Sequence, residues 1–289
     1  MKLSRRRFLT ASATVTAFGG SLTYVRFLEP KNLTLEHRIV NLPKERISKP
    51  MRILHLSDLH FSSVVSIGFL EEAFTRGMNQ SPDVICITGD FVTSSDLLPL
   101  VDLKSLLRDL ARTAPTFAVL GNHDGGPWSV AMGGSASTDE VASVLEASEV
   151  QLLQNESTTV KLNEQFLTLI GLEDLWSGNP NPARAFGSIS ADSAPRIVLS
   201  HNPDSKSLFT DQSWDLALCG HTHGGQIVVP FFGAPFVPIE DRRFTAGLND
   251  WDGRRIYTSR GIGNLHGIRF NCPPEIALIE LQPSPQDDT

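Results

Sequence analysis

The chain has 289 residues, of which 40% are hydrophobic and 20% charged, and this balance suits one large α/β domain or two small ones. Its formal net charge of −7 argues against broad electrostatic binding of nucleic acid, so no nucleic-acid partner is expected. The three cysteines, Cys86, Cys219 and Cys272, indicate neither a disulfide framework nor a C-x-x-C metal site.

Residues 1–30 differ in composition from the rest of the chain. Arg5, Arg6 and Arg7 are followed by Phe8 and Leu9, and a weakly apolar run covers residues 10–25. This pattern resembles a Tat export signal, which predicts contact with the Tat translocase and a location in the periplasm or on the outer face of the cytoplasmic membrane. The run is short for a membrane span and lacks a clear cleavage site. The segment is therefore predicted either to be removed or to remain as an anchor.

Residues 31–282 contain the predicted folded part of the chain. Residues 31–50 predict an edge strand (33–40) and a linker, residues 51–282 a catalytic domain, and residues 283–289 a polar tail. The domain opens with strands at 51–57, 84–88 and 116–122, separated by helices at 66–79 and 99–112. This alternation is typical of a βαβαβ half-sheet with parallel strands.

The second half of the domain is predicted to be richer in strands. Residues 125–134 read as a flexible loop carrying Trp128 and Met132, and Ser137 with Glu140 predicts a capping box for a helix to Ala147. Residues 150–153, 158–162 and 166–172 predict antiparallel strands, and residues 174–184 a loop. Further strands are predicted at residues 196–199, 216–219, 227–229, 256–258 and 275–281.

Five predicted strands end in side chains that can bind a metal ion. Open α/β folds place their ligands at the carboxyl ends of strands, so these side chains are expected to meet. A single histidine after a strand is more often structural, but five such ends in one chain predict one site. Carboxylate, carboxamide and imidazole without thiolate suit Mn, Fe or Zn, and the number of ligands fits two ions sharing a carboxylate. The side chains are Asp58 and His60, Asp90, Asn122 and His123, His201, and His221 and His223.

These residues also carry a family resemblance. Asp58-x-His60, Gly89-Asp90, Gly121-Asn122-His123-Asp124, His201 and Gly220-His221-x-His223 resemble, in order and spacing, the five motifs of the calcineurin-like metallophosphoesterases. The resemblance covers roughly residues 50–281. It implies a four-layer α/β/β/α sandwich of two mixed sheets, and an enzyme that hydrolyses phosphoric esters with two divalent metal ions.

The resemblance also implies a role for each motif residue. Asp58, His60 and His223 would hold one ion, Asn122, His201 and His221 the other, and Asp90 would bridge them. A metal-bridging hydroxide would attack a phosphodiester or pyrophosphate. His123 would be the general acid, or would donate to a phosphate oxygen, and Asp124 would orient it.

Other segments narrow the expected branch of the superfamily and its activity. Phe91 after Asp90, and Asp124 in place of Glu, depart from the protein phosphatases of the superfamily. Residues 259–263 and 269–275 look like the bacterial envelope branch of YaeI- and YkuE-type phosphodiesterases. The alternatives are a phosphomonoesterase with the same site, a lipid pyrophosphatase of the UDP-diacylglucosamine type, and a non-catalytic metal-binding protein. Because that lipid nucleotide is made in the cytoplasm, Tat export would argue against the lipid pyrophosphatase.

Three features beyond the metal motifs are left with two interpretations each. The glycine-rich residues 261–267 either present His266 or Arg269 to a phosphate or only connect two strands. Trp128 either touches the phosphorylated or lipid-linked substrate or belongs to a mobile connection. Residues 230–237, with three phenylalanines, either form a lip for an acyl chain or a membrane surface, or pack beneath the site. His37 and His55 are taken as structural.

Overall fold

The computed structural model describes residues 22–93, 98–187, 189 and 194–285, so most of the predicted export signal lies outside the described residues. The first sheet has the strand order β1 (Thr34–Leu42), β12 (Glu275–Pro283), β2 (Met51–Leu56), β3 (Val84–Thr88), β4 (Thr116–Val119), β5 (Gln151–Leu152). Strands β2 to β5 are parallel, whereas β12 runs antiparallel to β2 and parallel to the edge strand β1. The first sheet is therefore mixed.

The second sheet repeats this design. Its order is β10 (Gly247–Trp251), β11 (Arg254–Thr258), β9 (Leu216–Cys219), β8 (Arg196–Leu199), β7 (Gln165–Gly171), β6 (Glu156–Leu162). The four inner strands are parallel, and the edge strands β10 and β6 are antiparallel to their neighbours. The parallel strands of each sheet point their carboxyl ends towards one edge, which is where the polar motifs begin.

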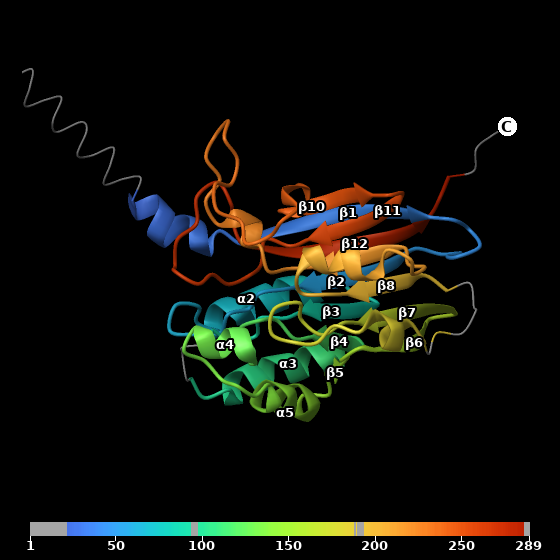
Figure 1. Cartoon of the computed structure of the whole chain (residues 1–289), viewed down its shortest axis with the longest axis horizontal. Helices are drawn as coiled ribbons and strands as arrows, with labels where there is room; N and C mark the ends of the chain where they lie inside the picture. The colour runs from blue at the N-terminus through green and yellow to red at the C-terminus, as the bar shows by residue number, and fades with distance from the viewer. Residues whose placement is uncertain (1–21, 94–97, 188, 190–193, 286–289) are drawn as a thin grey trace, which may run out of the picture.

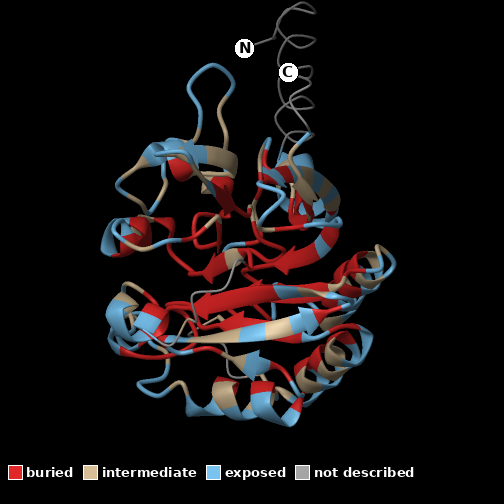
Figure 2. Ribbon diagram, turned by 90° about the vertical axis from the view of Figure 1, so that its right-hand side faces the viewer, coloured by how far each residue is buried: buried red, intermediate tan, exposed pale blue. Residues whose placement is uncertain are grey.

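The two sheets pack face to face with helices outside. A buried apolar cluster that includes Ile53, Val84, Leu169 and Ile197 fills the space between them, and Figure 2 shows this buried interior. Helices α2 (Ile67–Met78), α3 (Val101–Thr113) and α5 (Asp139–Ala147) cover the outer face of the first sheet. The short helices α6 (Pro182–Gly187), η3 (Pro203–Phe209) and η5 (Arg242–Phe244) cover the second. This arrangement confirms the predicted α/β sandwich of two mixed sheets.

Helix α2 shows why the helical predictions succeed. Its buried residues Leu70, Ala73, Phe74 and Gly77 recur at helical spacing, and the Ser66 hydroxyl caps the amino end by accepting from the Phe69 N–H. The helix ends at Asn79, shortly before a proline that disfavours helical backbone in the residue preceding it.

Several local predictions were wrong. The predicted loop at residues 125–134 contains a short helix, α4 (Pro127–Ala131), because Pro127 suits the first helical position. Helix α5 begins at Asp139 without a side-chain cap, so the predicted capping box does not form. Strand β5 is parallel to β4 rather than antiparallel to its successors. Residues 227–229 make only isolated bridges, and strand β10 was not predicted.

The amino-terminal end of the described chain is a short helical segment, η1 (Tyr24–Leu28), which precedes β1. Among the residues with a described structure, no helix is both long and apolar enough to cross a membrane.

Candidate metal centre

The predicted metal ligands lie in loops whose backbone is strained in a consistent way. Asp58, His60, Asp90, His221 and His223 all have positive φ angles, between 46° and 70°, in a region that residues with a side chain adopt at a cost. Backbone hydrogen bonds hold these loops together: the Asp58 N–H donates to the Gly89 carbonyl at 3.0 Å and the His60 N–H to the Asp90 carbonyl at 2.9 Å. The first two strand-end loops are thus fixed against each other.

Two glycines permit the close approach of these loops. Gly121 has an ordinary φ, but a Cβ at this position would overlap the Asp90 carboxylate, and one at Gly220 would overlap Ser57 and Asp58. The glycines that precede Asn122 and His221 are therefore required by space, because the carboxylates of the neighbouring loops occupy the position of a side chain.

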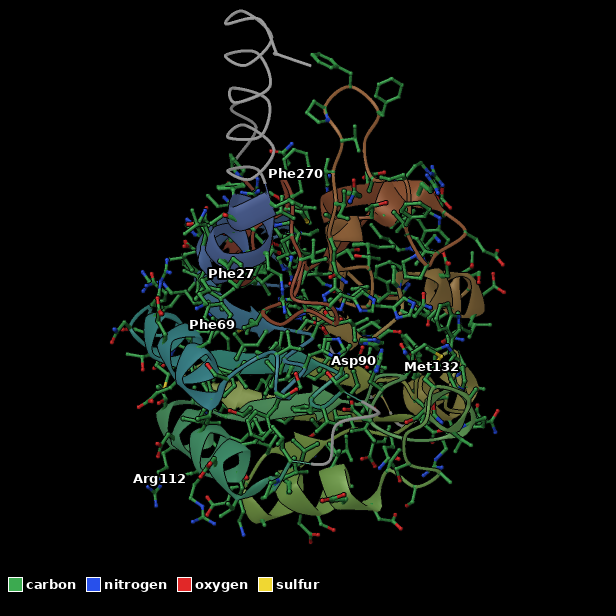
Figure 3. All side chains as sticks on the ribbon, turned by 90° about the vertical axis from the view of Figure 1, so that its left-hand side faces the viewer. Phe27, Phe69, Asp90, Arg112, Met132 and Phe270 are labelled. Carbon is green, nitrogen blue, oxygen red and sulfur yellow. The ribbon has the colours of Figure 1, made fainter. Side chains whose placement is uncertain are left out.

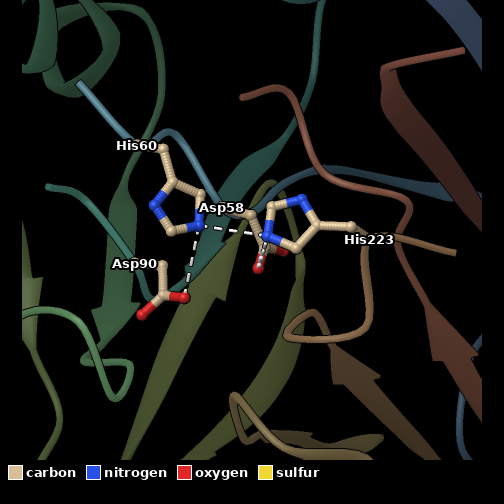
Figure 4. A group of neighbouring side chains, drawn as sticks. All are labelled: Asp58, His60, Asp90 and His223. Atoms are coloured by element: carbon tan, nitrogen blue, oxygen red, sulfur yellow. Dashed lines mark hydrogen bonds and ion pairs between the residues drawn. The ribbon is translucent and has the colours of Figure 1, made fainter. Parts of the chain in front are cut away.

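Asp58, His60, Asp90 and His223 form one group of ligand atoms, shown in Figure 4. All four are buried, and one ligand atom from each lies within 4.8 Å of the others. His60 Nε2 is 3.0 Å from His223 Nε2 and 3.4 Å from Asp90 Oδ2, and His223 Nε2 is 3.4 Å from Asp58 Oδ1. The structure therefore brings the first predicted set of ligands together with the predicted bridging carboxylate.

Asn122, His201 and His221 form a second group, which also contacts Asp90. The Asn122 Oδ1 atom is 2.8 Å from His221 Nδ1, and His201 Nε2 is 3.2 Å from Asp90 Oδ2. Main-chain carbonyls orient both rings: Thr88 O accepts from His201 Nδ1 at 2.7 Å, and Pro238 O lies 3.2 Å from His221 Nε2. Each carbonyl occupies one ring nitrogen, which leaves the other facing the group.

The donor set fits divalent metal ions. His201 Nε2 is buried, has no hydrogen bond among the described residues and faces Asp90 Oδ2 at 3.2 Å, while His60 Nε2 and His223 Nε2 face each other at 3.0 Å. Buried polar atoms placed in this way are costly unless something binds them. Oxygen and nitrogen donors without thiolate suit Mn, Fe or Zn. Asp90 Oδ2 lies between His60 and His201, as a ligand shared by two ions would.

The protonation states of the cluster also suit metal binding. Burial lowers the pKa of His60 and of His221 to about 3, so both rings are neutral near pH 7. Burial disfavours charge on Asp90 and His201 as well. Their mutual attraction nevertheless lowers the pKa of the Asp90 carboxyl and raises that of the His201 ring. Burial, with a contribution from Asp90, raises the pKa of Asp58 to about 6. Neutral imidazole and ionised carboxylate are the forms that bind metal, so the His201 ring, which is charged beside Asp90, would lose its proton when an ion binds.

His123 lies at the mouth of the cluster with a row of aromatic rings. Its ring is 7% exposed and meets His60 edge-on at 4.8 Å and Trp128 at 4.5 Å between centroids. Trp128 then neighbours Trp176 at 5.9 Å, and Trp176 meets His221 at 4.3 Å. A cavity of about 240 Å³ also borders His123 and Asp124. His123 therefore contacts both the predicted ligand His60 and this cavity.

The Asp124 carboxylate is held by the main chain, and its predicted role of orienting the His123 ring stays a prediction. Its two oxygens accept from four main-chain N–H groups, those of Gly121, Asp90, Phe91 and Val92, at 2.7–3.2 Å. These bonds tie the loop after β4 to the loop after β3. Asp124 thus fixes the loop that carries Asp90 against the loop that carries Asn122.

The position of Arg269 does not match the interpretation in which it contacts a phosphate. Its side chain is fully buried, and the guanidinium donates to the carbonyls of Arg260, Gly261, Gly263 and Cys272 at 2.6–3.1 Å. It supports the loop at residues 260–263, which contacts the Asp58 loop through the Gly263 N–H. Arg269 is therefore structural and does not present its charge to a phosphate.

His266 lies on the exposed rim near His123. Its side chain is exposed, and its charge contributes, after burial and His201, to lowering the pKa of His123. The contact of His266 and Trp128 with a substrate stays a prediction. Figure 3 shows Asp90 and the exposed Met132 on this side of the molecule.

Sequence reasoning missed two residues at the site. Trp176 was assigned only to a loop, yet it contacts His221. Asp174, just before it, is buried with one oxygen bound to the N–H groups of Trp176 and Ser177 and the other without a partner among the described residues. The signal was present: an acidic residue and a tryptophan follow an apolar strand, as in the other motifs.

The comparisons with known proteins identify the family of this chain. A family model for calcineurin-like phosphoesterases matches residues 51–225. The phosphodiesterase YaeI of Escherichia coli (strain K12) is 40% identical over 280 residues, which cover 96% of this chain and 99% of that protein. YkuE of Bacillus subtilis (strain 168), an uncharacterized metallophosphoesterase, is 31% identical over 97% of this chain and 98% of its own.

A further relative carries a more specific name. The UDP-2,3-diacylglucosamine pyrophosphatase LpxG of Chlamydia trachomatis serovar D is 29% identical over 321 residues, which cover 94% of this chain and 96% of that protein.

Proposed function

The chain belongs to the calcineurin-like phosphoesterases, in the branch of YaeI and YkuE, and on this basis we propose that it hydrolyses phosphodiesters or pyrophosphates with two divalent metal ions in the cell envelope. As a member of this family it is a metal-dependent phosphoric ester hydrolase. The observation that carries the proposal is the position of Asp90 Oδ2, 3.4 Å from His60 Nε2 and 3.2 Å from His201 Nε2. One carboxylate oxygen thus faces both groups of ligands.

The two ligand groups divide the binding of the ions. Asp58, His60 and His223 would hold one ion and Asn122, His201 and His221 the other, with Asp90 shared between them. When bound, the ions supply acidity to water and positive charge to the phosphate oxygens. The surrounding carbonyls and the Asp124 network keep the side chains in place, so little reorganisation is needed during the reaction.

His123 supplies the proton that the leaving group needs. Burial lowers the pKa of its ring, so the free enzyme holds it neutral. A bound phosphodiester anion beside the ring favours the imidazolium form, which can then donate its proton to the departing oxygen. The product alcohol leaves neutral, and the ring returns to its neutral state.

The test is hydrolysis of bis-p-nitrophenyl phosphate by the full chain, stripped of metal and then reloaded with Mn, Zn, Fe or Mg. We expect turnover that requires metal and falls about 10²-fold or more in His123→Ala. A companion assay on p-nitrophenyl phosphate separates a diesterase from the phosphomonoesterase alternative. Bound metal in two equivalents with no turnover on either ester would remove the diesterase proposal for simple substrates.

A lipid pyrophosphatase is the second candidate, and two observations favour it. LpxG resembles this chain over 94% of its length, and residues 227–239 expose a large apolar surface near the site. Cleavage of a UDP-linked lipid, with no activity on bis-p-nitrophenyl phosphate, would identify this function in place of the first.

The envelope location rests on the twin arginines. Because Arg5, Arg6 and Arg7 precede an uncharged run, we propose export by the Tat translocase. Fractionation of cells that produce the Arg5→Lys, Arg6→Lys, Arg7→Lys variant should find it in the cytoplasm. Unchanged export of that variant would contradict the proposal.

A further inference from the structure

Residues 227–239 form a protruding hairpin without a polar side chain. The sequence from Ile227 to Ile239 consists of Ile, Val, Pro, Phe, Gly and Ala only. Phe231, Phe232 and Phe236 are 105%, 86% and 79% exposed, and the hairpin stands out from the body in Figure 1. The alternative in which these rings pack beneath the site is therefore wrong. Single exposed apolar side chains are ordinary, but a contiguous apolar tip indicates a partner.

The hairpin holds its rings outward by internal hydrogen bonds. Val229 and Gly233 exchange two main-chain hydrogen bonds at 2.8 and 2.9 Å across the turn, and Phe231 takes a left-handed φ of 69°. At the base, the Arg242 guanidinium donates to the carbonyls of Ala234 and Pro235. The exposed conformation is thus built into the fold, and a partner would meet a preformed tip.

A second apolar element lies beside the hairpin. Leu22, Tyr24, Phe27 and Leu28, in and next to η1, are 42–59% exposed. Main-chain hydrogen bonds link the two elements: the Arg269 N–H donates to the Val25 carbonyl, and Phe270 exchanges hydrogen bonds with Gln226 and Val228 at the start of the hairpin. Figures 1 and 3 show η1 and the hairpin at the same end of the molecule.

From these features we propose that the hairpin and η1 form one surface that docks on a phospholipid bilayer, with Phe231, Phe232 and Phe236 inserted among the lipids. The composition favours a bilayer over a protein, because residues 227–239 have no polar side chain, whereas a protein interface surrounds its apolar core with a polar rim. The chain before η1 points to the same partner, since residues 9–25 carry no charged side chain. Two weak apolar contacts together bind a membrane stably where one alone is marginal.

The proposal is independent of the reaction at the metal centre and makes a specific prediction for position 232. Because Cys86, Cys219 and Cys272 are buried, a Phe232→Cys variant of the full chain can be labelled there with an environment-sensitive nitrobenzoxadiazole dye. With vesicles of phosphatidylethanolamine and phosphatidylglycerol, we expect a blue shift and a rise of emission of about threefold or more as the dye enters the lipid. The matched control is Phe166→Cys, at a 52% exposed phenylalanine on β7.

The controls separate the hairpin from the amino terminus. Insertion of an uncharged tip should persist at about 0.5 M salt, where the Debye length is only a few ångströms. If the protein sediments with vesicles while the dye at position 232 stays in water, the amino terminus alone binds and the proposal is wrong. Failure to sediment at all also overturns it. Hydrolysis of bis-p-nitrophenyl phosphate by the same labelled protein reports the metal centre separately, because no hairpin side chain belongs to the ligand groups.

Discussion

The metal cluster and the apolar hairpin are neighbours in sequence but opposite in surroundings. His223 precedes Ile227 by four residues, yet His223 is 3% exposed and Phe231 is 105% exposed. The buried region is made of the most polar side chains of the chain, each held by several contacts, and the exposed region is made of apolar ones. The comparison teaches that the buried polar groups gather in a cluster able to bind metal, whereas the exposed apolar groups gather at a tip for which we propose a membrane partner.

The sharpest test of this contrast pairs one substitution from each region. Asp90→Asn removes the charge shared by both ligand groups, so metal-dependent hydrolysis of bis-p-nitrophenyl phosphate should fall by more than about 100-fold. Loss of a residue that only hydrogen-bonds to a metal ligand costs roughly 10- to 100-fold. Phe232→Ser, in the hairpin, should stay within about twofold of wild type, since Phe232 is exposed at the tip and belongs to neither ligand group. Metal content by mass spectrometry should fall only in Asp90→Asn. Equal effects of the two substitutions would break the comparison.

The two regions should also differ in their response to acid. The hairpin has no titratable side chain, whereas His55, beneath the cluster, is buried and its pKa is lowered to about 3. In the unfolded chain this ring has a pKa of about 6.5, so between these values the unfolded state binds the extra proton. The stability that His55 contributes as a neutral group is present above pH 6.5 and is lost as the pH falls towards 3.

Urea unfolding of the metal-free protein at pH 7 and pH 5 measures this loss. Wild type should lose about 2 kcal/mol more than His55→Gln between the two values, at 1.4 kcal/mol for each unit below 6.5. Glutamine can still pair with the Thr88 hydroxyl, which is 2.8 Å from His55 Nε2. The same pH dependence in both proteins would show that the ring is not buried in its neutral form.

The smallest expected effect concerns the aromatic rim between the two regions. If Trp128 contacts an aryl or other planar substrate group, Trp128→Ala should raise KM for bis-p-nitrophenyl phosphate about three- to tenfold and leave kcat unchanged, as expected for one lost stacking contact. A non-aromatic diester should show no change in KM. A fall in kcat with an unaltered KM would assign Trp128 to the positioning of His123 instead.

The sequence predicted most of what positions the site. Short apolar runs that end in polar motifs located the strands of both sheets that carry the ligands, and helical spacing located α2 and α3. The spacing of Asp58, Asp90, Asn122 and the four predicted histidine ligands anticipated the side chains that the structure brings together. These predictions succeed because strand periodicity and parallel topology bring the strand ends to one edge.

The remaining features depend on tertiary contacts that no local pattern contains. A positive φ at His60 or Asp90 is stable only because neighbouring loops hold it. The role of Arg269 could not be decided from the sequence. An arginine next to a glycine-rich loop has the same local pattern whether its side chain faces a phosphate or is buried against four carbonyls. The exposure of Phe231 was equally undetermined, because an apolar run in a loop can pack inward or protrude.

The hairpin also has a structural role at the metal centre, because the Pro238 carbonyl lies 3.2 Å from His221 Nε2. Pro238 lies at the carboxyl-terminal root of the hairpin, so the same thirteen residues that reach the solvent also hold the orientation of a ring in the second ligand group. A change at the tip that shifts this root would be transmitted to the ring by a single hydrogen bond. If the hairpin docks on a bilayer as proposed, this hydrogen bond would connect docking to the second ligand group, and the rate on a soluble ester would then change when vesicles are added.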